Sequence, residues 1–72
     1  MASNIKIERV RHGYSQQILA DHIGVSMNTL RSYEEDPMNV PGNKLVELAR
    51  HFHVSTDYLL GLTEDRGEEV EE

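Results

Sequence analysis

The chain has 72 residues, a formal net charge of −6 at pH 7 and no cysteine. Such a length allows one small domain, and without cysteine neither disulfides nor thiolate zinc sites can stabilise it. No run of about 18 apolar residues is present, and the N-terminus MASNIKIERVRH lacks the apolar centre of a signal peptide. We therefore expect a cytoplasmic protein without a membrane segment, stabilised by helix packing and a dimer partner.

The negative charge is concentrated toward the C-terminal end. Residues 1–33 hold four basic and two acidic residues, whereas residues 34–72 hold three basic and eleven acidic ones. The segment TEDRGEEVEE contains six acids and one arginine, a composition typical of disorder. We predict a domain over residues 1–62 and an acidic, disordered tail over residues 63–72. The folded part is then close to neutral, so the net charge does not exclude a nucleic-acid partner.

Local signals mark where helices begin and end. A cap-forming serine flanked by apolar residues at staple spacing begins three helices, at Ser15, Ser26 and Ser55. Glycine enters left-handed backbone without strain and ends three helices, at Gly13, Gly24 and Gly61. A further helix begins near Pro41, because proline suits the first helical position.

These signals predict an all-α fold of five short helices. They span about residues 4–13, 15–24, 26–35, 41–53 and 55–61. No segment alternates with period two, so strands are not expected. The expected core consists of Ile5, Leu19, Ala20, Ile23, Val25, Leu30, Tyr33, Leu45, Leu48, Ala49, Phe52, Val54 and Leu59.

A helix-turn-helix is predicted over residues 16–33, which read QQILADHIGVSMNTLRSY. Ala20 is small where two crossing helices approach closely, and Gly24 lies in a turn that requires positive φ. Val25 and Leu30 then fill the wedge between the helices. Together with two capped helix starts, this combination is typical of the motif.

The second helix of this motif has a polar side. At about 100° per residue, the positions opposite its buried residues are Met27, Asn28, Arg31, Ser32 and Glu35. Polar residues on any surface helix usually contact only solvent. After a helix-turn-helix turn, however, the same pattern indicates a surface that contacts a nucleic acid.

The segments IKIER, GYSQQILA, IGVS, TLRSYE, LVELARHF and VSTDYLLG follow one another over about residues 4–62. In these segments the chain resembles the Cro/repressor-type helix-turn-helix family, also called the XRE family. The resemblance implies a five-helix, lambda-repressor-like DNA-binding domain whose third helix lies in the major groove. It also implies a sequence-specific, nucleoid-associated transcriptional regulator of bacterial or phage type, with repression as the favoured activity.

The resemblance further implies which residues contact DNA. The base-reading positions are Met27, Asn28, Arg31 and Ser32. The expected contacts to the DNA backbone are Ser15, Gln16, Gln17 and Ser26, where helix N-termini present amides and positive dipole ends. Asn28 is expected to read adenine in bidentate fashion, and Arg31 to reach phosphate or guanine.

Two charged residues match structural positions of the family, and one loop departs from it. Arg9 and Glu34 match a shielded salt bridge between the first helix and the end of the third; the alternative is two solvated surface charges. The loop EDPMNVP is longer than in many relatives and has Asp36 where glycine is common. Glu35 and Asp36 would face phosphates there, which would weaken binding or move the loop away from DNA.

The main alternative function is a protein-interaction module of the same fold, antitoxin-like or anti-repressor, with weak or no DNA binding. The net charge favours it, and the polar side of the third helix disfavours it. If DNA is bound, a homodimer on an inverted-repeat operator is expected, because one small domain contacts few phosphates. Candidate dimer contacts are Tyr58, Leu60 and Leu62, which alternatively complete the core.

No catalytic or metal site is expected. The four histidines are scattered along the chain, and no serine, histidine and acid arrangement surrounds a plausible pocket. We therefore expect neither an enzyme, nor a cofactor, nor a small-molecule ligand.

Overall fold

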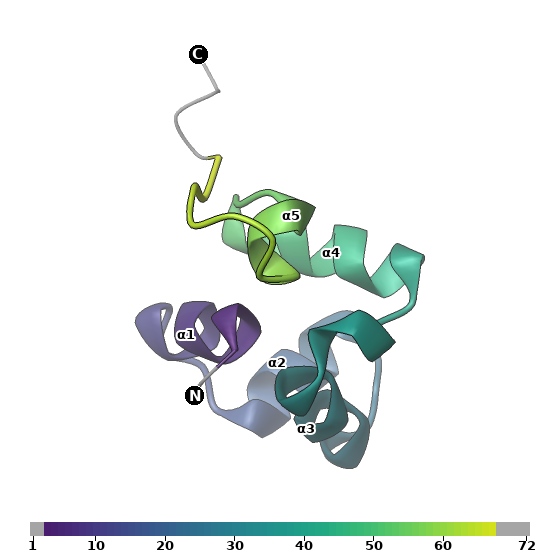
Figure 1. The fold of residues 1–72 in the computed structure, drawn as a ribbon. Coiled ribbons are helices and arrows are strands. Elements are labelled where there is room, and N and C mark those ends of the chain that lie inside the picture. Colours follow the sequence, from purple (N-terminus) through teal and green to yellow (C-terminus); the bar gives the residue numbers. More distant parts are fainter. Residues whose placement is uncertain (1–2, 68–72) are drawn as a thin grey trace.

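The computed structural model describes residues 3–67, which form five α-helices, one short 3-10 helix and no strand (Figure 1). The elements are α1 (Asn4–Arg11), α2 (Gln16–Ile23), α3 (Met27–Glu35), η1 (Pro37–Asn39), α4 (Gly42–Phe52) and α5 (Thr56–Leu59). The predicted all-α fold of five helices is confirmed, whereas η1 was not predicted. None of these helices has the length and apolarity needed to cross a bilayer.

Serine hydroxyls cap the N-termini of α2, α3 and α5 as predicted. The Oγ atoms of Ser15, Ser26 and Ser55 each accept a hydrogen bond of 3.1 Å from the backbone N–H three residues further on. Ser3 caps α1 in the same way, accepting from the N–H of Lys6 at 3.2 Å. These bonds satisfy first-turn amides that lack a partner within the helix, which explains why short helices are stable here.

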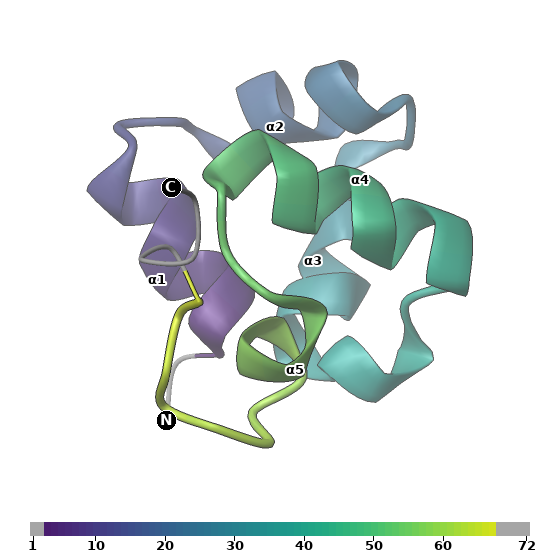
Figure 2. The same ribbon diagram turned by 90° about the horizontal axis from the view of Figure 1, so that it is seen from above.

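The helices divide between the two ends of the molecule. Figure 1 shows α2 and α3 together at one end and α4 with α5 at the other, with α1 beside them. α1 packs against α3 and α5, and α4 packs against α2 and α5, as the view from above also shows (Figure 2). This arrangement leaves one side of α3 facing solvent.

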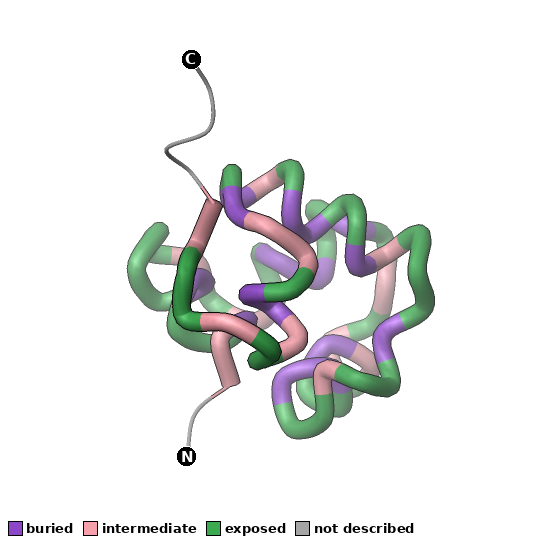
Figure 3. The backbone as a smooth tube through the Cα atoms, turned by 45° about the horizontal axis from the view of Figure 1, so that its top comes forward, coloured by how far each residue is buried: buried purple, intermediate pink, exposed green. Residues whose placement is uncertain are grey.

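The core lies where the five helices meet (Figure 3). Twelve of the thirteen predicted core residues are buried, and the exception, Val25, is partly buried against them. Val40 and Tyr58 are buried in addition. Three charged residues are also buried, namely Glu8, Arg9 and Glu34. Because charges are costly to bury without partners, each of these must be paired.

Glu8 connects α1 to the C-terminal part of the described chain. Its side chain is fully buried and accepts hydrogen bonds from the Tyr58 hydroxyl at 2.9 Å and from Arg66 Nη2 at 2.8 Å. The backbone N–H of Ser55 donates to the carbonyl of Arg66 at 2.7 Å. The first part of the segment predicted to be a disordered tail, residues 63–67, is thus bonded to the domain through Arg66. Residues 68–72 of the predicted tail lie outside the described residues.

The three candidate dimer contacts differ in exposure. Tyr58 is 7% exposed, and its hydroxyl is bonded to Glu8, so it completes the core and is not available to a second subunit. Leu60 is partly buried against the core, whereas Leu62 is 67% exposed. Of the three, only Leu62 presents most of its apolar side chain to solvent.

Candidate nucleic-acid interface

The helix-turn-helix is formed by α2, a turn at Gly24 and α3. Gly24 has φ of +73°, in the left-handed region that favours glycine, and the next amide, on Val25, donates to the carbonyl of Ala20 at 3.0 Å. Ala20 and Leu30 are fully buried between the two helices. The turn geometry predicted from the sequence is thus present, and it fixes the angle at which α3 projects.

A lysine from α4 also holds this turn. Lys44 Nζ donates to the carbonyl of Ile23 at 2.6 Å and lies 3.4 Å from a carboxylate oxygen of Glu47. A cation at the C-terminal end of α2 donates to a carbonyl that has no partner within the helix. It also interacts favourably with the negative end of the helix dipole. No local pattern in the sequence indicates this contact, because Lys44 lies 21 residues from Ile23.

A buried ion pair holds the C-terminal end of α3. Arg9 Nε lies 2.6 Å from Glu34 Oε2, and the two side chains are 10% and 5% exposed. Arg9 Nη1 also donates to the carbonyl of Tyr14 at 2.8 Å, and Gln16 Nε2 donates to Glu34 Oε1 at 3.1 Å. The expected pair is therefore present and is shielded from solvent. Its network joins α1, the start of α2 and the end of α3.

The residues predicted to read bases lie together on the outer side of α3. Asn28, Arg31 and Ser32 are exposed, and Met27 is partly buried. Arg31 Nη1 donates to Asn28 Oδ1 at 3.2 Å, one turn apart on the helix. Three of these four side chains are thus open to solvent on one side of α3.

The residues predicted to contact the DNA backbone surround the starts of α2 and α3. Ser15, Gln17 and Ser26 are exposed, and Gln16 is partly buried. Some of their polar atoms are already bonded within the chain. Besides the bond from Gln16 to Glu34, Gln17 Nε2 donates to Asp21 Oδ1 at 2.9 Å, and the Ser26 hydroxyl donates to Thr29 Oγ1 at 2.9 Å. The serine caps use the third amide of each helix, so the amides at the first two positions of α2 and α3 remain as donors for a phosphate.

Little positive charge is available at this surface. Arg31 is the only lysine or arginine in residues 16–35, and Glu35 and Asp36 are exposed at the end of α3. Asp36 Oδ1 accepts from the N–H of Met38 at 3.2 Å and so caps η1. Its φ of −145° needs no glycine, which explains how this chain accommodates aspartate at a position where relatives often have glycine.

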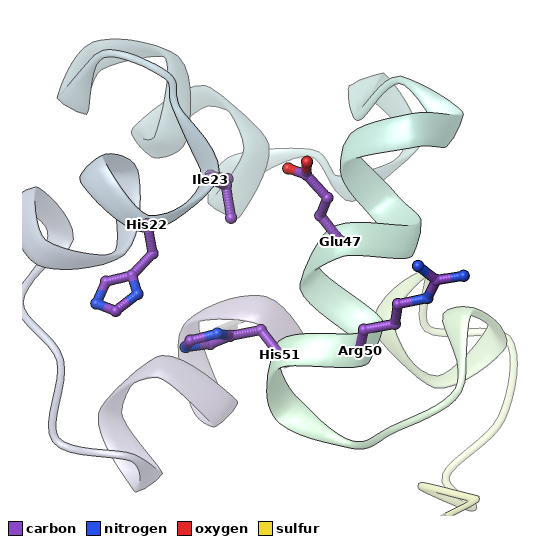
Figure 4. A pocket seen from close by; sticks show the side chains of 5 residues that line it. All are labelled: His22, Ile23, Glu47, Arg50 and His51. Carbon is purple, nitrogen blue, oxygen red and sulfur yellow. The ribbon is translucent and has the colours of Figure 1, made fainter.

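A separate hollow of about 360 Å³ lies between the end of α2 and α4. It is lined by His22, Ile23, Glu47, Arg50 and His51 (Figure 4). His51 Nε2 is hydrogen-bonded to the Tyr14 hydroxyl at 3.0 Å, and its ring centroid lies 5.0 Å from that of His22. Burial lowers the pKa of His51 most, and the neighbouring imidazoles of His22, His12 and His53 lower it further.

This histidine cluster does not form a metal site. Within residues 3–67, no group of three or more histidine, cysteine, aspartate or glutamate side chains is arranged to hold a metal ion. None of the residues that line the hollow belongs to the outer side of α3.

Similarity to known proteins agrees with this geometry. A model of the helix-turn-helix family matches residues 5–59. The chain is 41% identical over 63 residues to the uncharacterized HTH-type transcriptional regulator YobD of Bacillus subtilis (strain 168), covering 88% of this chain and 56% of the relative. It is 34% identical over 64 residues to the HTH-type transcriptional regulator ImmR of the same organism, covering 89% of this chain and 50% of the relative.

The chain thus spans about half the length of the curated relatives that it matches. No solved structure matches it. The family match covers most of the described helices and includes the whole helix-turn-helix. The chain therefore belongs to the helix-turn-helix family of the Cro/repressor, or XRE, type.

Proposed function

We propose that this chain binds double-stranded DNA sequence-specifically, inserts α3 into the major groove and regulates transcription, with repression as the favoured activity. The observation that carries the proposal is the exposed polar side of α3, held at a fixed angle by the Arg9–Glu34 pair and by Lys44. A rigid helix with exposed amide, guanidinium and hydroxyl groups is suited to reading base edges. Both relatives are named transcriptional regulators and not enzymes.

In the proposed complex, Met27, Asn28, Arg31 and Ser32 face the bases. Ser15, Gln16, Gln17 and Ser26 lie beside the two phosphate backbones, where first-turn amides contribute donors. Because the chain brings few cations to this surface, a homodimer on an inverted repeat would double the available contacts. Half-sites about one helical turn apart fit a two-fold dimer, and the exposed Leu62 with Leu60 is a candidate contact between subunits.

The alternative is a protein-interaction module of the same fold. It is favoured by the exposed carboxylates of Glu35 and Asp36 at the end of α3 and by the shortage of cations. Such a module would act at the same surface through a basic or neutral protein partner and would bind DNA weakly or not at all.

Selection from a random duplex library followed by binding titrations separates the two functions. The proposed regulator should recover an inverted repeat and lose affinity as salt rises from about 50 to about 200 mM, because binding releases counterions from DNA. Recovery of no common sequence, with no retardation of any duplex at low salt, would leave the interaction module as the better explanation.

A further inference from the structure

The hydrogen bond between Arg31 and Asn28 bears on which base the recognition helix reads. Both residues are exposed, and Arg31 Nη1 donates to Asn28 Oδ1 at 3.2 Å. They lie three positions apart, which places their side chains one above the other on the same side of α3. The two side chains therefore act together at the surface that the proposed function assigns to DNA.

The bond changes what Asn28 offers to a base. Reading adenine requires the amide nitrogen and the amide oxygen side by side, one donating to N7 and the other accepting from the N6 amino group. In this structure the oxygen is directed along the helix to Arg31. This bond uses one of the two lone pairs of the oxygen and ties the amide to the guanidinium. An adenine would therefore have to share the amide oxygen with Arg31.

The same bond prepares Arg31 to read a different base. A guanidinium has five N–H donors, and one of those on Nη1 is used here, which leaves the Nε and Nη2 edge for a ligand. Among the described residues, no carboxylate lies within ion-pairing distance of Arg31, although Glu35 follows one turn later. The neighbouring acceptors N7 and O6 of guanine match such a pair of donors.

We infer that Arg31 reads a guanine in each operator half-site, an inference that rests on the proposed function. Asn28 is then a positioning residue that holds the guanidinium. Holding it in place reduces the rotamer freedom that a long side chain loses on binding. Asn28 contributes through its oxygen, as an acceptor for Arg31, and not by pairing with adenine. At the base that faces Arg31, the domain should therefore select a base whose major-groove edge carries two hydrogen-bond acceptors.

The test uses a duplex recovered by selection, in which single purines are replaced one at a time. The probe is 7-deazaguanine or 7-deazaadenine, each of which removes the N7 acceptor and keeps Watson–Crick pairing. With the unaltered chain, 7-deazaguanine at one position per half-site should weaken binding roughly tenfold, and 7-deazaadenine should have little effect at the positions facing α3. In Arg31→Ala this sensitivity to 7-deazaguanine should disappear.

Two variants at Asn28 separate positioning from direct reading. Asn28→Asp keeps an oxygen that accepts from Arg31 but cannot donate to adenine N7, so the sensitivity to 7-deazaguanine should persist even though overall affinity falls. Asn28→Ala removes the acceptor, and the sensitivity should fall to roughly threefold or less. Arg50→Ala is the matched control, since it removes an exposed cation from α4, and its sensitivity should equal that of the unaltered chain.

The outcomes are distinct. If a duplex is recovered and 7-deazaadenine weakens binding in a manner abolished by Asn28→Ala, Asn28 reads adenine and the inference is wrong while the proposed function stands. Undiminished sensitivity to 7-deazaguanine in Arg31→Ala also overturns it. Failure to recover any bound duplex overturns the proposed function, and the inference with it.

Discussion

Replacing Arg9 by methionine tests whether the buried pair holds the helix-turn-helix together. The variant keeps an aliphatic side chain of similar length, but among the described residues it leaves the Glu34 carboxylate, 5% exposed, with the Gln16 amide as its remaining hydrogen-bond donor. Removing one partner of a buried pair typically costs about 3–5 kcal/mol, because the other charge stays buried without compensation. The Arg9 bond to the carbonyl of Tyr14 is lost as well.

This loss is large compared with the stability of a domain of this size. A chain of 72 residues is expected to unfold with a free energy of about 4–11 kcal/mol. At ~4–8 °C per kcal/mol, the melting temperature of Arg9→Met should fall by more than about 10 °C. Urea unfolding followed by circular dichroism at pH 7 gives the free energy directly, and melting curves give the shift in temperature.

A double variant and a control make this measurement decisive. Arg9→Met combined with Glu34→Leu replaces the pair by apolar side chains and should recover most of the lost free energy, since no charge is then left buried. Arg50→Met removes an exposed arginine from α4 and should change stability by less than about 0.5 kcal/mol. A loss below about 1 kcal/mol in Arg9→Met would refute the reasoning, because that is the range of solvated surface pairs.

Three further predictions concern the recognition helix, the turn and the histidine cluster. Asn28→Ala should weaken specific binding by roughly 0.5–1.5 kcal/mol in duplex titrations, because Arg31 loses its positioning partner, while leaving the melting temperature nearly unchanged; a large loss of helicity would show a structural role instead. Lys44→Met should lower the free energy of unfolding by about 1.5–3 kcal/mol in urea, because it removes a charged hydrogen bond to the Ile23 carbonyl, and wild-type stability would exclude that role. The pKa of folded His51 is lowered from 6.5, mainly by burial and then by His22, so the unfolded chain binds more protons and stability should fall as pH drops below about 6.5. Urea midpoints from about pH 7.5 to 5.5 should fall less in His51→Gln than in the unaltered chain, and equal slopes would show that His51 does not contribute.

The helix boundaries and most of the core could be predicted because their causes are local. A serine cap requires only that an oxygen reach an amide three residues away, and this spacing is visible in the sequence around Ser15, Ser26 and Ser55. The left-handed turn at Gly24 is equally local. The Arg9–Glu34 pair was predicted only through resemblance to a family, since its partners lie 25 residues apart.

Contacts between segments far apart in the sequence were not predicted, because no local pattern marks them. Nothing near Glu8 indicates that its carboxylate is fully buried, because its partners Tyr58 and Arg66 lie 50 and 58 residues away. No local pattern indicates that Lys44 lies at the end of α2, because the carbonyl that it bonds belongs to Ile23, 21 residues away. The sequence left Tyr58 either at a subunit contact or in the core, and the hydrogen bond from its hydroxyl to Glu8, 50 residues away, decides for the core.

The bond between Glu8 and Arg66 makes residues beyond the last described helix part of this domain. The family match stops at residue 59, yet a fragment ending there would lose the guanidinium that lies 2.8 Å from a fully buried carboxylate. Such a fragment would contain every described helix, and its buried Glu8 would keep the Tyr58 hydroxyl at 2.9 Å and Arg11 Nε at 3.6 Å but lose its shortest ion pair. Boundaries drawn from the helices alone would therefore cut the chain before a residue that pairs with this buried carboxylate.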